Sequence, residues 1–323
     1  MLSAMLVSCF SAPFMHHGFF AMDTYITVDA RTSDQALFRD IENLVYDEER
    51  LFSRTFADTK LYELNKSGRY DVGEETARVI STALEISDAT DGAFNPCMGS
   101  LIELWDIKSE NPRVPDNDEI IQRLETVDSS LVEVSGSTVT IPEGMKIDLG
   151  GIAKGCSAEK VLELLLERGV SDALVGFGGS IACIGSPKDG EAWSVGIRNP
   201  FDDGGIVGTL KVTDCIISVS GAYERYFEAD GKRYHHILDP QTGMPSESDI
   251  ESVAVISKSG AVSDALSTAL FVMGSEKAIE LYEDGIYDFE AVMVMKNREL
   301  VVTRGLEGVF ARDDGYKAGV TYR

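Results

Sequence analysis

Hydrophobic and polar positions follow two different periods along the chain, and each period predicts one type of element. Residues 24–30 alternate apolar and polar side chains, which is typical of a half-buried strand. Apolar side chains recur at helical spacing in 33–51, where Ser33 would cap the helix, and in 74–89. Further helices are predicted at 119–127, 157–168, 260–273 and 275–283, and strands at 131–134, 138–141, 173–177, 193–197, 207–212, 216–219, 253–256, 289–295 and 300–303.

The order of these elements indicates a fold class. Helices and hairpins are mixed without the regular alternation of strand and helix that builds a parallel sheet. Asp230-Gly231 is a strong signal for a tight turn between two antiparallel strands. The pattern therefore favours an α+β fold.

Composition and charge exclude several classes of protein. The 323 residues contain 29 Lys and Arg against 54 Asp and Glu, so the formal charge is −25. Such an acidic chain repels phosphate backbones, which argues against general binding to nucleic acids. No apolar run approaches the roughly 20 residues that span a bilayer, and the five cysteines include no C-x-x-C pair.

The first 20 residues resemble a leader segment. Residues 1–14 are apolar and uncharged, and Leu-Val-Ser-Cys at 6–9 fits a bacterial lipoprotein cleavage site in which Cys9 becomes acylated. The basic region and long apolar stretch of a signal peptide are missing, so a truncated signal and a loose cytoplasmic terminus both stay open. The first alternative predicts an extracytoplasmic protein that is anchored to the membrane through lipidated Cys9.

Two glycine-rich stretches suggest turns. In 146–159 an apolar strand leads through Asp148 and two glycines to a helix expected near Cys156, and Lys154 stands just before it. A glycine turn that leads into a helix start gathers backbone N–H groups into an anion site, although an ordinary turn with a solvated lysine fits as well. Gly-Phe-Gly-Gly at 176–179 lacks the third glycine of a dinucleotide loop and favours a tight turn between strands.

Two further stretches hold groups that handle protons or cations. Residues 234–245 contain two histidines beside a rigid Asp-Pro turn, and His236 would act as a general base or simply pack at a strand end. Asp264 and Thr268 are four residues apart on one face of a predicted helix. That pair suits Mg²⁺ together with phosphate oxygens, while a helix-capping role for Ser263 or Asp264 is the alternative.

Taken in order, these blocks resemble the ApbE-like flavin transferases, the FAD:protein FMN transferase family. The resemblance covers residues 21–323 as one catalytic region, after the possible leader of 1–20. It rests on Met-Asp-Thr at 22–24, Gly-Ala-Phe-Asn-Pro at 92–96, Asp-Leu-Gly-Gly-Ile-Ala-Lys-Gly at 148–155, Ser-Gly-Ala-Tyr-Glu-Arg at 220–225, the stretch 236–245, and Asp-Ala-Leu-Ser-Thr-Ala at 264–269.

The resemblance implies a T-fold-like α+β architecture of antiparallel sheets and packed helices, with FAD in a deep cleft. It also implies a Mg²⁺-dependent transfer of FMN from FAD to a Ser or Thr hydroxyl of a target flavoprotein, with release of AMP. A FAD pyrophosphatase and a non-catalytic, exported FAD-binding protein are the alternatives. Carried over, Met22, Ala93, Phe94, Asn95, Asp148, Lys154 and Ile237 would bind FAD, Gly151 (through its carbonyl), Asp264 and Thr268 would bind the metal, and His236 and Asp264 would be catalytic.

Three positions depart from the family pattern and bear on the flavin. Asp23 replaces a glycine and adds a negative charge, and Asn95 replaces an aspartate and removes one. Thr55 stands where a tyrosine often covers the flavin, and neighbouring Phe56 would substitute for that ring. The departure at Thr55 is the reason why hydrolysis of FAD stays open.

Overall fold

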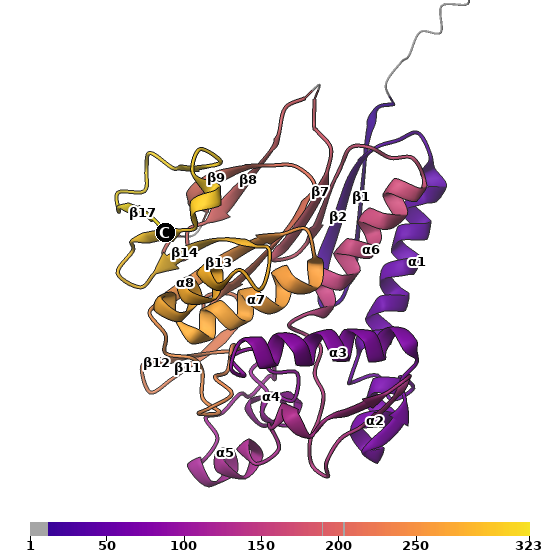
Figure 1. Ribbon diagram of the computed structural model, residues 1–323, viewed down its shortest axis with the longest axis vertical. Helices are drawn as coiled ribbons and strands as arrows, with labels where there is room; N and C mark the ends of the chain where they lie inside the picture. Colours follow the sequence, from indigo (N-terminus) through magenta and orange to yellow (C-terminus); the bar gives the residue numbers. More distant parts are fainter. Residues whose placement is uncertain (1–11, 189, 203) are drawn as a thin grey trace, which may run out of the picture.

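The chain combines α-helices with mainly antiparallel strands, which confirms the α+β prediction. The computed structural model describes residues 12–188, 190–202 and 204–323 (Figure 1). Within these ranges the α-helices are α1 (Gln35–Phe52), α2 (Lys60–Ser67), α3 (Glu74–Ala89), α4 (Gly99–Trp105), α5 (Asn117–Leu124), α6 (Ala153–Glu167), α7 (Gly260–Met273) and α8 (Ser275–Asp284).

A nine-stranded sheet forms the centre of the molecule, in the order β1-β2-β6-β7-β10-β13-β14-β15-β17. Neighbouring strands are antiparallel except β15 and β17, which run parallel. Its strands are β1 (Phe14–Ala21), β2 (Thr24–Arg31), β6 (Ala173–Phe177), β7 (Ser180–Ile184), β10 (Cys215–Gly221), β13 (Ile250–Ser257), β14 (Glu290–Met295), β15 (Leu300–Val302) and β17 (Val320–Tyr322).

A different layer covers each face of this sheet. Helices α1, α6 and α7 pack on one face (Figure 1). On the other face lies a small antiparallel sheet of β8 (Trp193–Arg198), β9 (Ile206–Val212) and β16 (Phe310–Arg312). Because both faces are covered, the central strand β13 is buried at almost every position and is apolar along most of its length.

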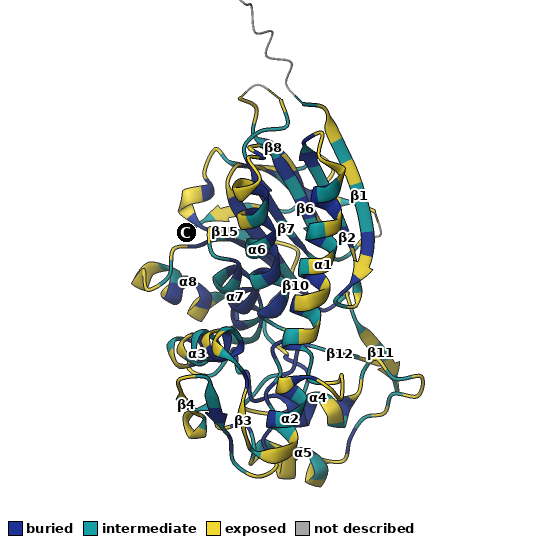
Figure 2. Ribbon diagram, turned by 90° about the vertical axis from the view of Figure 1, so that its right-hand side faces the viewer, coloured by how far each residue is buried: buried dark blue, intermediate teal, exposed yellow. Residues whose placement is uncertain are grey.

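A further layer lies at one end of the molecule, around α2, α4 and α5 (Figure 2). It includes the three-stranded sheet of β3 (Arg69–Asp71), β5 (Thr138–Thr140) and β4 (Glu133–Ser135), and the hairpin of β11 (Tyr226–Ala229) and β12 (Lys232–His235) lies beside it. Trp105, at the end of α4, is buried and donates from Nε1 to the carbonyl of Gly243 at 2.8 Å. This contact fixes the histidine-bearing stretch 234–245 against the end layer.

Several helices begin elsewhere than predicted, and the capping residues explain why. Asp34, rather than Ser33, accepts the first-turn N–H of α1. Ser259 caps α7, so Asp264 lies in the second turn of that helix and the capping alternative for Ser263 or Asp264 is wrong. Helix α6 begins four residues before the predicted 157, at Ala153, which brings Lys154 into its first turn.

Strand β1 lies where the sequence predicts a leader. Phe14–Ala21 pair with all eight residues of β2, so this part of 1–20 belongs to the folded sheet. Residues 1–11 of the predicted leader, which include Cys9, lie outside the described residues. In the described part of the chain, no helix has both the length and the apolar character needed to cross a membrane.

The helices α6 and α7 cross at two glycines. A Cβ atom placed on Gly155 would lie 2.0 Å from the carbonyl oxygen of Gly260, and one on Gly260 would lie 2.0 Å from that of Gly155. Only hydrogen atoms therefore separate the two backbones at this point. The close approach lets the backbone N–H of Gly155 donate to Oδ2 of Asp264 at 3.0 Å.

Replacing Gly155 by alanine is expected to lower the free energy of unfolding by about 3 kcal/mol, because the helices must move apart. Asp264 then moves with α7, and activity falls as well. Urea unfolding, followed by circular dichroism, measures the change in stability. Gly319→Ala is the control, since nothing lies within 4 Å of its Cβ position. Equal stability of the two variants would contradict the close-packed crossing.

Candidate functional site

A cleft of about 1140 Å³ lies between the main sheet, β8 and the end layer. Its walls come from segments that are far apart in the sequence, including the β1–β2 turn, the start of α6 and the middle of α7. The structure brings all the predicted site residues to this cleft: Met22, Ala93, Phe94, Asn95, Asp148, Gly151, Lys154, His236, Ile237, Asp264 and Thr268.

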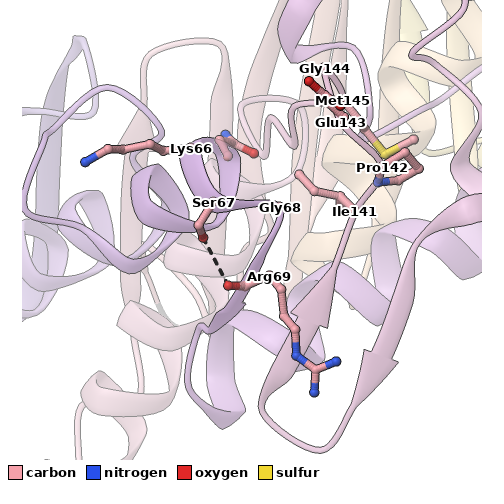
Figure 3. Close-up of a pocket in the computed structure, with 10 residues that line it drawn as sticks. Lys66, Ser67, Gly68, Arg69, Ile141, Pro142, Glu143, Gly144 and Met145 are labelled. Atoms are coloured by element: carbon pink, nitrogen blue, oxygen red, sulfur yellow. Dashed lines mark hydrogen bonds between the residues drawn. The ribbon is translucent and has the colours of Figure 1, made fainter.

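A second, smaller hollow of about 420 Å³ lies at the end of α2 (Figure 3). It is lined by residues 65–69 and 141–145, and Ser67 donates to the carbonyl of Arg69 inside it. None of the predicted site residues lines this hollow. The larger cleft is therefore the candidate site.

The turn between β1 and β2 forms part of the cleft rim. Met22 and Asp23 both have positive φ, 52° and 59°, as a two-residue hairpin turn requires. The Met22 N–H donates to Glu49 at 2.8 Å, which fixes the turn over the cleft. Lys108 lies 2.6 Å from the Asp23 carboxylate, and this hydrogen bond and charge hold the pKa of Asp23 below its usual range. The extra negative charge at Asp23 is therefore balanced.

Asp148 shapes the glycine turn that precedes α6. Its Oδ1 accepts the N–H of Gly150 at 2.8 Å, and its Oδ2 accepts from the guanidinium of Arg54. Arg54 also bonds Glu103 at 3.0 Å and is mostly buried. Sequence reasoning missed Arg54, because nothing in the local pattern links it to a residue 94 positions away.

Asn95 has both ends of its amide engaged with the backbone. Its Nδ2 donates to the carbonyl of Val127 at 2.8 Å, and its Oδ1 accepts the N–H of Cys97 at 2.8 Å. A carboxylate could not donate the first of these bonds, which explains why asparagine fits here. Asn95 lines the cleft, but its side chain holds the loop in shape.

Lys154 and Asp264 meet where α6 crosses α7. The Lys154 ammonium donates to the carbonyl of Gly150 at 3.2 Å and lies 3.9 Å from the Asp264 carboxylate. Ile152, the N-cap residue of α6, provides no side-chain cap, and in the first turn Leu149 accepts the N–H of Ala153 while Asp264 accepts that of Gly155. The Lys154 ammonium and the positive end of the α6 dipole together form an anion-binding corner.

Oxygen donors of three kinds gather beside this corner. A Cβ placed on Gly151 would lie 3.6 Å from the Thr268 hydroxyl, so the Gly151 backbone and Thr268 are close neighbours. Asp264 is buried one turn earlier on α7. A carboxylate, a hydroxyl and a backbone carbonyl are oxygen ligands that suit Mg²⁺. Among the described residues, no group of three or more His, Cys, Asp or Glu forms a metal site.

His236 also lines the cleft and lies next to Arg225. Its Nδ1 is 3.3 Å from the carbonyl oxygen of Arg225, which can only accept, so Nδ1 carries the hydrogen and Nε2 keeps its lone pair. Burial, with repulsion from Arg225, lowers the pKa of His236 to about 3. The imidazole is therefore neutral at physiological pH. Neighbouring His235 is buried and bonds the carbonyl of Ser246 at 3.0 Å, which is a structural role.

Because the pKa of His236 is lowered in the folded state, the free energy of unfolding is expected to depend on pH. Between about 3 and the unfolded value of 6.5, the unfolded chain binds a proton that the folded chain does not. Stability therefore falls as the pH falls below 6.5, by at most about 2 kcal/mol from this group at pH 5. Urea unfolding at pH 7 and pH 5 is expected to show a smaller loss for His236→Gln than for the unchanged protein. An identical loss would show that His236 protonates freely in the folded state.

The Ser220–Arg225 stretch contributes further groups to the cleft. Tyr223 packs against Gly221, where a Cβ would lie 2.5 Å from its ring, and Arg198 lies 5.0 Å from the centre of that ring. Glu224 lies beside Gly179, and burial of its carboxyl group raises its pKa. The motif at 220–225 indicated that this stretch matters, but sequence reasoning assigned no role to Glu224 or to Arg198 on β8.

An aromatic side chain lies beside Thr55, the position where the family often has a tyrosine. Thr55 and Phe56 both line the cleft, and Phe56 is 41% exposed. Phe94, by contrast, is buried against Gly151, where a Cβ would lie 3.1 Å from its ring. An accessible aromatic side chain is therefore present next to Thr55.

Comparisons with known proteins agree with this arrangement. The sequence model of the ApbE family matches residues 22–293. The protein named FAD:protein FMN transferase of Treponema pallidum is 34% identical over 292 residues, which cover 84% of this chain and 80% of that protein. The protein of the same name from Klebsiella pneumoniae is 33% identical over 304 residues, 92% of this chain and 94% of that protein.

Solved structures are similar along nearly the whole chain. The crystal structure of the ApbE protein from Thermotoga maritima has a TM-score of 0.86 at 30% identity, and the match covers 92% of this chain and 99% of that one. The flavin transferase ApbE from Vibrio cholerae has a TM-score of 0.82 at 27% identity, over 92% of this chain and 100% of that one. Since the family model and these relatives span most of its length, this chain belongs to the ApbE family.

Proposed function

We propose that this chain transfers the FMN moiety of FAD to a Ser or Thr hydroxyl of a target flavoprotein and releases AMP. The curated relatives named above are FAD:protein FMN transferases, and this chain is an enzyme of that transferase class. The observation that carries the proposal is the shared cleft, which Lys154, Asp264 and His236 all line although they lie in separate parts of the sequence. An anion-binding corner and a neutral base in one cleft suit attack on a pyrophosphate.

The donor set fits a magnesium ion. Gly151, through its carbonyl, Asp264 and Thr268 would hold the ion, and their oxygen atoms match its preference. When bound, the ion would neutralise negative charge on the pyrophosphate of FAD. The low exposure of Asp264, 5%, limits competition from solvent at this position.

The residues of the chain supply positioning and proton transfer. Lys154 and the positive end of the α6 dipole would orient the pyrophosphate of FAD. His236 would accept the proton of the acceptor hydroxyl at Nε2, while the hydroxyl oxygen forms a bond to the FMN phosphorus. The bond between that phosphorus and the bridging oxygen breaks, and the oxygen leaves with AMP.

One experiment tests the function. The protein is incubated with FAD and Mg²⁺, with and without a candidate acceptor, and AMP and covalent flavin fluorescence in a denaturing gel are measured. We expect covalent flavin on the acceptor together with an equal amount of AMP. Rapid AMP release without an acceptor would instead favour a FAD pyrophosphatase. Stoichiometric FAD binding without AMP under both conditions would favour a non-catalytic FAD-binding protein.

We also propose that the chain is exported and anchored through a lipid on Cys9, as a lipoprotein at the membrane. The support is the Leu-Val-Ser-Cys sequence at 6–9. The expected result is that the protein partitions into the detergent phase of Triton X-114 extracts, and that Cys9→Ala abolishes the partition. Recovery of both forms in the aqueous phase would contradict the anchor.

A further inference from the structure

Two cysteine side chains face each other on neighbouring strands of the main sheet. Cys183 on β7 and Cys215 on β10 are register partners in an antiparallel pair, and their sulfur atoms lie 3.9 Å apart. Both thiols are free, and neither residue lines the candidate cleft. The pair therefore has no part in the proposed transfer reaction.

The backbone geometry suits a bond between these sulfur atoms. Opposite residues of antiparallel strands have Cα atoms about 4.5–5.5 Å apart, and disulfides join Cα atoms about 4.4–6.8 Å apart. The sulfur atoms already lie within contact distance. Side-chain rotation would therefore close the bond without a shift of the strands.

The surroundings favour a bond within the chain over one with another molecule. Cys183 is 1% exposed and Cys215 is 8% exposed, and both belong to the core between the main sheet and the β8–β9–β16 sheet. The pair is also the last rung of the β7–β10 ladder, since β10 begins at Cys215. Strand ends open more readily than strand centres, so this rung gives an oxidant transient access.

We propose that Cys183 and Cys215 are a thiol oxidation site that closes to a cross-strand disulfide. A small-molecule disulfide such as oxidised glutathione is the oxidant. The Cys183 thiolate attacks one of its sulfurs and releases a first thiol, and the Cys215 thiolate then attacks the Cys183 sulfur and releases a second. The two protein thiols are oxidised, the small disulfide is reduced to two thiols, and the protein loses two hydrogens.

The bond would stabilise one wall of the cleft. Ile181 and Ile217, two rungs away on the same strands, are also register partners, and both line the cleft. A cross-link at residues 183 and 215 closes a loop of about 30 residues, which restricts the unfolded chain. We expect the oxidised protein to unfold at a temperature roughly 5 °C higher than the reduced protein.

The test uses the full chain with Cys9, Cys97 and Cys156 replaced by serine, and the unchanged protein beside it. Each is equilibrated in glutathione buffers of increasing oxidised fraction, and free thiols are counted by maleimide labelling after denaturation. We expect both thiols to disappear together in a monomer, with a mass lower by two hydrogens. Peptide mapping should join the peptides that contain residues 183 and 215, and a reducing agent should restore both thiols.

The matched control keeps Cys97 and Cys156 and replaces Cys183 and Cys215 by serine. Cys156 lies on α6 and Cys97 lies outside the strands, so neither is the register partner of another cysteine, and we expect both to stay reduced under the same conditions. Two free thiols in the fully oxidising buffer, glutathione attached to each cysteine, or a disulfide-linked dimer would overturn the proposal. None of these readouts depends on FMN transfer, so the two proposals fail separately.

Discussion

Replacing Asp264 by asparagine is expected to reduce AMP release from FAD by roughly 10²–10³-fold. The change keeps the size of the side chain and an oxygen that can accept the Gly155 N–H. It removes the negative charge that would hold a divalent cation beside Gly151 and Thr268. Initial rates of AMP formation, measured by chromatography over a range of Mg²⁺ concentrations, report the effect.

Asp249→Asn is the matched control for this substitution. Asp249 also accepts a helix N-terminal N–H, that of Ser275 at 2.9 Å, but it does not line the cleft. We expect this variant to lose some stability and to keep its rate of AMP release. Full activity of Asp264→Asn, or full activity of the unchanged protein in the presence of a chelator, would refute the metal role.

Replacing His236 by alanine is expected to leave FAD binding unchanged and to reduce transfer to the acceptor by roughly 10²–10⁴-fold. The lone pair on Nε2 is the group lost, because the Arg225 carbonyl already engages Nδ1. The lowered pKa keeps the imidazole of the free enzyme neutral, so protonation of His236 should not limit kcat/KM between pH 5 and 8. Flavin quenching measures binding, and gel fluorescence measures transfer.

His235→Ala provides the comparison within the same segment. Its ring packs against Phe271 at 5.4 Å and bonds the Ser246 carbonyl, so its loss should reduce thermal stability more than the rate per folded molecule. If His236→Ala transfers FMN at the normal rate, His236 has only a structural role. If it also fails to bind FAD, the separation of binding from proton transfer is wrong.

The charges in the cleft differ from the acidic composition of the whole chain. A charge of −25 excludes partners with many phosphates, yet the proposed substrate carries a pyrophosphate. Lys154 and the start of α6 supply positive charge in the cleft, while the negative groups Asp148 and Asp23 are paired with Arg54 and Lys108. Strong dependence on a divalent cation is therefore expected for an enzyme whose chain is acidic and whose substrate carries a pyrophosphate.

Local sequence patterns predicted much of the secondary structure. The helical periods of 74–89 and 260–273 correspond closely to α3 and α7, since their apolar stripes face the core. The Gly-Phe-Gly-Gly stretch is the tight turn that was predicted, between Phe177 of β6 and Ser180 of β7. Strand β1 escaped prediction because its apolar residues fit a leader equally well before its pairing with β2 is known.

The sequence by itself determined the α+β class, the main helices and the residue types available for chemistry, because each depends on periodicity or on short motifs. Only the tertiary structure decided how these residues meet. The approach of α6 and α7 at Gly155 and Gly260, and the pairing of Arg54 with Asp148, join segments about 100 residues apart. Such contacts depend on chain packing across the whole molecule, and no local pattern records them.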